Sequence, residues 1–231
     1  GVSYKYVDRT VTDILGDAFP VSLQLGLMGL VIAILVGIPL GTLAANFRGT
    51  FIDIGAMFTS TAGISVPVFV IGAMLIYVFG IWLKVLPVGL WETPYHMILP
   101  AVTLAFGPTA YLARLTRASV LEVLEKDWVR TARSKGLSGF MTVTKHVLRN
   151  ALVPVVTVLG PLTAILVTGS FVVEFVYAIP GMGRFFITAV MNRDYDLIMG
   201  TTLLFAILLI VTNTIVDIIY HFLDPRIRVE D

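Results

Sequence analysis

Five stretches of the chain are long and apolar enough to cross a membrane as helices. A helix rises about 1.5 Å per residue, so a span needs about 20 mostly apolar residues. Backbone groups cannot stay unpaired in lipid, and a helix satisfies all of them internally. The sequence therefore predicts an all-α, polytopic membrane protein with five transmembrane helices. They comprise residues 21–47, 54–83, 97–113, 151–173 and 198–220, and only the last contains a charged residue, Asp217.

Composition agrees with this fold class and excludes several kinds of site. Mean hydropathy is +0.92, and only 13% of the residues are charged, against about 25% in a soluble domain. The absence of cysteine excludes disulfides and cysteine-ligated metals. The histidines are too dispersed to suggest a metal site, and no Ser, His and Asp arrangement signals catalysis. We therefore expect neither metal nor catalytic residues, and lipid rather than nucleic acid as the surroundings.

The loops differ in their content of basic residues, which favour the cytoplasmic side. One set of loops, with the C-terminus, holds 11 of the 16 Lys and Arg residues. This asymmetry places the loop 114–149 and the tail 224–231 in the cytoplasm, and residues 1–18 and the loop 174–197 outside. The membrane domain then covers residues 19–223. A chain that starts outside and crosses five times suggests a sixth, N-terminal span upstream of Gly1.

Glycine and proline interrupt several of the spans. Two interpretations remain open: kinks with close helix packing through small residues, or a side that lines a polar path. Ser65 and Pro67, beside further hydroxyls, are candidates for such a path. The interruptions are Gly37 with Pro39, Gly63 with Pro67, Gly107 with Pro108, and Gly160 with Pro161.

The loop 114–149 is the most basic part of the chain. An apolar stripe at helical spacing predicts one helix from Ser119 that ends near Gly136, followed by a second from Ser138 toward Arg149. Such an amphipathic projection suits docking to a partner or to the membrane surface. A basic loop that only holds the topology explains the charge equally well. The stripe consists of Val120, Leu121, Leu124, Trp128 and Ala132.

This loop also resembles a known motif. Permeases of ATP-binding-cassette (ABC) importers carry Glu-Ala-Ala, three residues, Gly, nine residues, then Ile-x-Leu-Pro. Here Arg130 and Thr131 replace Glu and Ala, His146 stands at the Ile position, and Leu148-Arg149 replaces Leu-Pro. These departures match the peptide-transporter branch, in which RTARxKGL precedes a His and an Arg-Asn-Ala-Leu run. The chain reads RTARSKGL and HVLRNALVP.

The resemblance extends over nearly the whole chain, and VSYKYVDRTV near its start is most similar to the B-type permease subunit of oligopeptide importers. It implies six spans and alternating-access transport of oligopeptides across the bacterial cytoplasmic membrane. Dipeptides, nickel chelates or another small solute are the alternative cargoes. Further similar segments are FPVSLQLG, VGIPLG, HMILP, ARLTRASVLEVL, YAIPGMGR, NRDYDLIMG and DPRIR.

The resemblance also implies partners. No G-x-x-x-x-G-K-[ST] loop occurs in the chain, so ATP and Mg would be bound by two cytoplasmic ATPase subunits. A second homologous permease would complete a heterodimer, and an extracytoplasmic binding protein would deliver peptide. The chain itself would be no enzyme and hold no cofactor. The residues implied to couple it to the ATPases are Arg130, Thr131, Ala132, Arg133, Lys135, Gly136 and Leu137.

The external YAIPGMGR segment is a candidate gate, although an ordinary turn fits equally well. Glu174 and Arg184 flank it and are candidates for an exposed ion pair. An ion-coupled transporter or channel would need ionisable residues near the bilayer centre, and none is found; Asp217 lies close enough to the interface to be hydrated. An intramembrane enzyme would need catalytic groups on facing spans, which are not evident. The gate candidates are Glu174, Pro180, Gly181 and Gly183.

Overall fold

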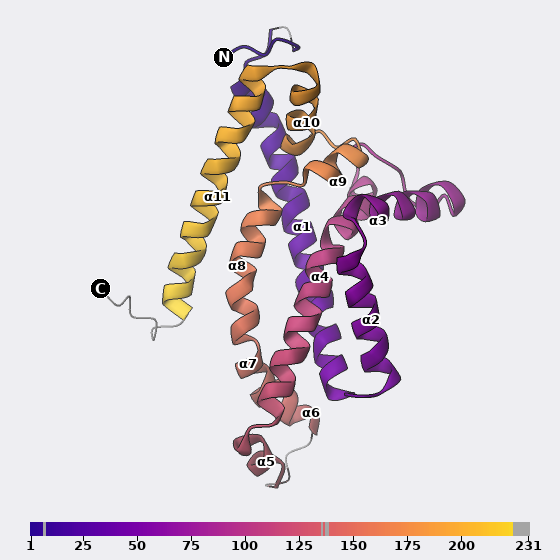
Figure 1. Cartoon of the computed structure of the whole chain (residues 1–231), viewed down its shortest axis with the longest axis vertical. Helices are drawn as coiled ribbons and strands as arrows, with labels where there is room; N and C mark the ends of the chain where they lie inside the picture. The colour runs from indigo at the N-terminus through magenta and orange to yellow at the C-terminus, as the bar shows by residue number, and fades with distance from the viewer. Residues whose placement is uncertain (7, 135, 137–138, 224–231) are drawn as a thin grey trace. The chain divides into compact units, whose positions relative to one another are not determined.

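The computed structural model describes residues 1–6, 8–134, 136 and 139–223, most of which are helical (Figure 1). Its described part contains no strand, only one isolated bridge between Val2 and Thr10. Four described segments are long and apolar enough to span a membrane, or five if one bent helix pair is a single span. The helical, multi-pass fold expected from the sequence is confirmed. The four segments are Val11–Asn46, Pro94–Leu124, Leu148–Val176 and Tyr195–Ile215.

The long helices extend beyond the apolar stretches that revealed them. Helix α1 (Val11–Asn46) begins ten residues before the expected start at position 21, and α4 (Pro94–Leu124) exceeds the expected span at both ends. Helix α11 covers Tyr195–Leu223. Hydropathy marks only the part of a helix that is apolar, whereas backbone hydrogen bonding continues into polar sequence. The segment 1–18 therefore includes the first turns of α1.

Two of the expected spans are interrupted. Pro67, which lacks an N–H, separates α2 (Phe51–Ser65) from α3 (Val68–Leu75), and Val66 before it is extended, as residues before proline tend to be. A π-helical segment, η1 (Ile76–Trp82), continues α3. Gly169, with a φ of +95°, lies in the second interruption. That span consists of α7 (Leu148–Ala151), α8 (Val153–Val167) and α9 (Phe171–Val176).

The chain forms two compact units, and α1, α4 and α8 contribute residues to both. The first unit comprises residues 1–30, 67–105 and 160–231, described to residue 223. In it α10 (Met182–Asn192) packs against both α9 and α11, and α9 packs against α3 (Figure 1). A cluster of apolar side chains packs the start of α1 against α10 and against α11. They are Val11, Ile14, Leu15, Ala189 and Leu197.

The second unit comprises residues 31–66 and 106–159. Between α4 and α7 it contains three short helical segments, α5 (Asp127–Ser134), α6 (Gly139–Met141) and η2 (Thr142–Val147). The η2 segment contacts α5, α6 and α7. A compact apolar core joins this projection to the ends of α1 and α4. Its members are Ala45, Val120, Val129, Val147 and Ala151.

Glycines permit close helix approach within each unit. In the first unit a Cβ at Gly26 would lie 2.2 Å from the Leu166 carbonyl oxygen; in the second, a Cβ at Gly41 would lie 2.3 Å from that of Ala113. Gly37 and Gly63 are similarly crowded, by Thr109 and Phe106 respectively. Close packing through small residues therefore accounts for Gly37 and Gly63, which the sequence also allowed as part of a polar path.

Candidate functional site

The projection that carries the expected coupling motif begins with a break. Helix α4 ends at Leu124 and α5 begins at Asp127, so the single helix expected from Ser119 to Gly136 is in fact two. The break rotates the second helix relative to the predicted stripe. Val129 is consequently buried, whereas Trp128, predicted on the apolar face, keeps 41% of its surface exposed. The prediction was wrong at this position because periodicity was carried across the break.

Helix α5 has one face in the core and one face open. Val129 packs with Val120 and Val147, which are equally inaccessible. Thr131 is exposed, and its hydroxyl donates only to the Asp127 carbonyl 3.1 Å away. Trp128 and Thr131 thus form an exposed surface of α5 that is accessible to a partner subunit.

Gly136 follows α5 with a φ of +85°, and a Cβ added there would meet nothing within 4 Å. The backbone conformation, rather than a lack of space, therefore favours glycine at this position. Helical structure is described again from Gly139; Ser138, where the sequence predicted the second helix to begin, lies outside the described residues. Of the other motif residues, Ala132 is half-buried. Lys135 and Leu137 lie outside the described residues, as do the side chains of Arg130 and Arg133.

The candidate gate contains a fully buried carboxylate. Glu174 Oε2 accepts hydrogen bonds from the backbone amides of Gly183 (2.7 Å) and Arg184 (3.3 Å), and Oε1 accepts one from the Ser22 hydroxyl (2.9 Å). The Met182 amide donates to Ser22 Oγ over 2.9 Å. These three amides begin α10, where the helix dipole favours a negative charge. Glu174 and Ser22 together cap α10.

The expected Glu174–Arg184 ion pair is absent. The Arg184 guanidinium instead donates to the Ala178 carbonyl oxygen over 2.7 Å, and only its backbone amide reaches Glu174. Charge alone suggested the pair, but the helix N-terminus supplies the donors that Glu174 needs. The assumption that the pair is exposed was also wrong, because Glu174 has 0% of its surface exposed.

Three glycines surround this carboxylate. A Cβ at Gly181 would lie 2.3 Å from Glu174 Oε2, and one at Gly169 would lie 2.8 Å from Oε1. At Gly183 the obstacle is the Phe171 backbone, 2.8 Å away. The structure therefore brings Gly181 and Gly183 together with Glu174, as the gate hypothesis grouped them, while Pro180 is exposed. Glycine is required here for space around a buried carboxyl group.

Ser65 and Pro67, the two path candidates from the second predicted span, have local roles in the structure. The exposed Ser65 hydroxyl donates to the Thr61 carbonyl, 2.9 Å away in the same helix. Pro67 forms the break between α2 and α3 and is also exposed.

Several residues with well-defined polar contacts were not singled out from the sequence. Tyr177 is buried, with its hydroxyl 2.8 Å from Thr103 Oγ1 and 3.3 Å from the Gly72 carbonyl oxygen. The Leu90 amide donates to the Tyr177 carbonyl over 3.0 Å. Tyr177 thereby joins the gate segment to α3, α4 and the loop before α4. It lies in the YAIPGMGR motif, but a single sequence does not indicate which distant residues its side chain contacts.

Asp194, at the corner between α10 and α11, is a second such residue. It accepts a hydrogen bond from the Ser3 hydroxyl at 2.5 Å and one from the Leu197 amide at 3.2 Å. Burial disfavours its charged form, but these bonds and those from the amides of Tyr4 and Lys5 outweigh that effect. They hold the pKa of Asp194 below its ordinary value. The motifs VSYKYVDRTV and NRDYDLIMG thus contact each other.

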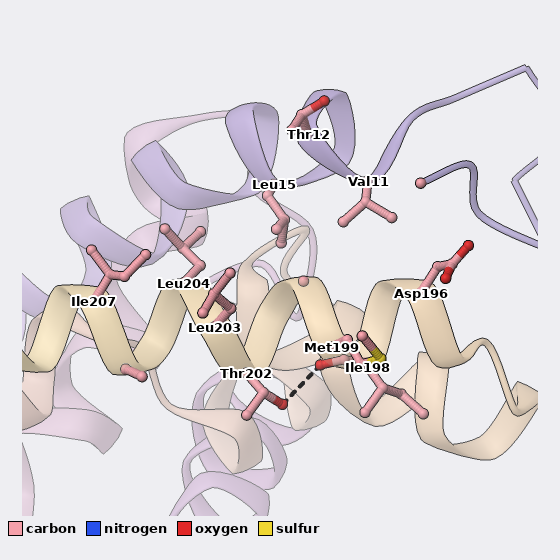
Figure 2. A pocket seen from close by; sticks show the side chains of 13 residues that line it. Val11, Thr12, Leu15, Asp196, Ile198, Met199, Thr202, Leu203, Leu204 and Ile207 are labelled. Carbon is pink, nitrogen blue, oxygen red and sulfur yellow. Dashed lines mark hydrogen bonds between the residues drawn. The ribbon is translucent and has the colours of Figure 1, made fainter.

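An apolar groove of about 780 Å³ runs between the first turns of α1 and α11 (Figure 2). Thr202 on its wall donates its hydroxyl to the Ile198 carbonyl over 2.8 Å, so this polar group is satisfied within α11. The groove therefore offers mainly aliphatic contacts. Its walls include Val11, Leu15, Met199, Leu203 and Ile207.

Comparison with known proteins accounts for this arrangement of helices. Residues 37–229 match the family described as the inner membrane component of binding-protein-dependent transport systems. The chain belongs to this family. It is therefore a multi-pass permease subunit of the inner membrane, and the resemblance read from its motifs is confirmed. A permease of this kind is the membrane subunit of its transport system rather than the ATPase, and it works with partner subunits.

Individual relatives resemble the permease along nearly its whole length. The dipeptide transport system permease protein DppB of Bacillus subtilis (strain 168) is 49% identical over 228 residues, covering 99% of this chain and 74% of that protein. The oligopeptide transport system permease protein OppB of Haemophilus influenzae is 43% identical over 230 residues, covering 99% and 75% respectively.

Solved structures confirm the fold. One chain of the inward-facing MetNI methionine ABC transporter superposes with a TM-score of 0.77 at 17% identity, covering 93% of the permease and 98% of that chain. An amino acid ABC transporter with histidines gives a TM-score of 0.70 at 16% identity, covering 90% and 93%. Because identity is so low, these matches bear on the fold alone.

Proposed function

We propose that the permease translocates short peptides, with oligopeptides as its main cargo, by alternating access driven by ATP hydrolysis in its partner subunits. The observation that carries this proposal is the similarity over 99% of the chain to permeases named for dipeptide and oligopeptide transport. Dipeptides are the second candidate cargo, because the relative at 49% identity is a dipeptide permease. Nickel chelates and other small solutes are the remaining alternatives.

The proposed assembly contains this chain, a second homologous permease, two cytoplasmic ATPase subunits that bind ATP and Mg, and an extracytoplasmic peptide-binding protein. In this assembly the loop 114–149 faces the cytoplasm, and the segment from Arg130 to Leu137 docks onto an ATPase subunit. Two features of the fold support the docking role. Helix α5 is anchored to the core through Val129 while Trp128 stays exposed, and Gly136 has a backbone conformation that favours glycine.

An ion-coupled mechanism is the principal rival, and Glu174 is a fully buried carboxylic acid of the kind that it would use. In the structure, both oxygens of Glu174 accept hydrogen bonds from neighbouring groups of the chain. Those partners cap a helix, which is a structural role. The contacts of Glu174 therefore favour ATP-driven transport over ion coupling.

Uptake into proteoliposomes tests the proposal. The assembly is purified from its native membrane through a tag on this chain, reconstituted with its binding protein, and loaded with ATP. Labelled pentapeptide and dipeptide are supplied in parallel, each with and without a protonophore. We expect ATP-dependent pentapeptide uptake that the protonophore does not alter. Uptake of dipeptide alone would establish the second cargo, whereas uptake that requires an ion gradient would contradict the proposal.

A further inference from the structure

The second unit contains an ion pair that the proposed function has not used. The guanidinium of Arg117 on α4 donates from Nε to Asp53 Oδ1 over 2.6 Å and from Nη2 to Asp53 Oδ2 over 2.7 Å. Only 6% of the Asp53 side chain and 26% of the Arg117 side chain are exposed. Two parallel bonds fix orientation as well as distance, and limited solvent access reduces screening.

Arg117 lies on the helix that leads into the coupling projection. Val120, three residues further along α4, is fully buried in the core that also holds Val129 of α5. Leu124, at the end of α4, packs against the same core. A displacement of α5 must therefore shift the end of α4 or break this core.

Asp53 lies in the first turn of α2 and also holds the preceding loop. The Gly49 amide donates to Asp53 Oδ2 over 3.0 Å, and Gly49 has a φ of +78°. Just before this loop, Ala45 of α1 belongs to the same core as Val129. The carboxylate of Asp53 thus binds both the α1–α2 loop and α4.

A second ion pair nearby provides a contrast. Arg48 Nη1 lies 3.3 Å from Glu125 Oε1, and 64% and 71% of these two side chains are exposed. An exposed pair with a single contact contributes only about 0–1 kcal/mol and is screened by salt. It joins the same loop to the residue after α4, but without fixed geometry.

We propose that Asp53 and Arg117 are positioning residues that transmit movement of the coupling projection from α4 to α2. This inference rests on the proposed function, because it assumes that α5 is moved by an ATPase subunit. Because the pair is largely buried and has two hydrogen bonds, the first turn of α2 must follow a movement of α4. A lysine at position 117 would keep the positive charge but could not form the two parallel hydrogen bonds of the guanidinium. Neither residue need touch the peptide.

The test separates transmission from simple stabilisation. Removing one charge of a buried pair leaves the other uncompensated, whereas removing both is often tolerated. Asp53→Asn should therefore lower both the melting temperature of the reconstituted assembly and its peptide-stimulated ATPase activity. The double variant Asp53→Asn with Arg117→Met should recover the melting temperature yet still lack most of the stimulation. Arg117→Lys should retain the melting temperature and lose part of the stimulation.

The exposed pair supplies the matched control, since Arg48→Met removes a charge from the same loop. It should leave both the melting temperature and the peptide-stimulated ATPase activity at their wild-type values. The inference is overturned if the double variant regains stimulation together with stability, if Arg117→Lys is fully stimulated, or if Arg48→Met is impaired as strongly as Asp53→Asn. A wild-type assembly that does not respond to peptide would contradict the proposed function instead.

Discussion

The hydroxyl of Ser22 on α1 donates to the Glu174 carboxylate on α9 over 2.9 Å and accepts from the Met182 amide at the start of α10. Helix α1 and the consecutive helices α9 and α10, which lie far from α1 in the sequence, therefore meet at one oxygen atom. Glu174 Oε2 accepts hydrogen bonds from the N-terminal amides of α10 rather than from a cationic side chain. This arrangement fixes the candidate gate segment within the first unit.

Removing the Ser22 hydroxyl should destabilise the protein. Ser22→Ala leaves the buried Met182 amide without its acceptor and Glu174 Oε1 without the hydroxyl donor. We expect a loss of about 1–3 kcal/mol, measured as a lower melting temperature in detergent. Thr61→Ala is the control, because the exposed Thr61 hydroxyl donates only to the Met57 carbonyl of its own helix. Equal melting temperatures for both variants and wild type would show that the cap at Ser22 contributes nothing.

A methyl group at Gly181 should disrupt the same cap. Its Cβ would lie 2.3 Å from Glu174 Oε2, so Gly181→Ala must displace the carboxylate, at a cost of about 1–3 kcal/mol. Gly16→Ala, in α1 of the same unit, meets nothing within 4 Å and should be neutral or stabilising by up to about 1 kcal/mol. Thermal unfolding of the two variants provides the comparison. A destabilised Gly16→Ala beside an unaffected Gly181→Ala would reverse the expected order.

Asp194 should make the attachment of the N-terminal segment sensitive to acid. Its hydrogen bonds hold its pKa below the ordinary value despite burial. A depressed pKa means that the ionised group stabilises the fold above the unfolded-state pKa, and that this contribution is lost as pH falls through the folded-state value. Protection of the Lys5 amide from hydrogen exchange should therefore fall below about pH 4, after correction for intrinsic rates.

In Asp194→Asn the protection of the Lys5 amide should be low throughout and largely independent of pH. The same acid-induced loss in this variant would assign the pH dependence to another group.

Orientation in the membrane can be tested with matched substitutions. The chain has no cysteine, so Glu92→Cys and Glu122→Cys each introduce the only thiol, both at exposed positions. The distribution of Lys and Arg predicts position 122 in the cytoplasm and position 92 outside. An impermeant maleimide added to intact cells should label only the variant at 92, and inverted vesicles should show the opposite. Labelling of both from one side would contradict the orientation.

Sequence reasoning located what depends on local patterns. Apolar stretches marked the long helices, and the motif around Gly136 marked a glycine that has a positive φ in the structure. Proline content could not separate Pro67, which breaks a span, from Pro39 and Pro161, which α1 and α8 accommodate. Those two helices continue through their prolines without a break in helical structure.

Contacts between distant segments could not be predicted from the sequence. Glu174 was grouped with the glycines near it in the chain, but Ser22 lies 152 residues away and carries no local signal. The stripe on α5 failed for a related reason. A two-residue break after Leu124 altered which side chain faces the core, and periodicity does not reveal such a break.

The role of Gly136 in coupling is most directly tested by peptide-stimulated ATPase activity in the reconstituted assembly. Gly136→Val and Gly139→Val are compared, because a Cβ at either position meets nothing within 4 Å, and only Gly136 has a positive φ. A β-branched residue resists that conformation at a cost of about 1–3 kcal/mol. With normal assembly and unchanged peptide affinity of the binding protein, Gly136→Val should lose stimulation and uptake while Gly139→Val keeps both. Wild-type stimulation and uptake in Gly136→Val would contradict the coupling role of this segment.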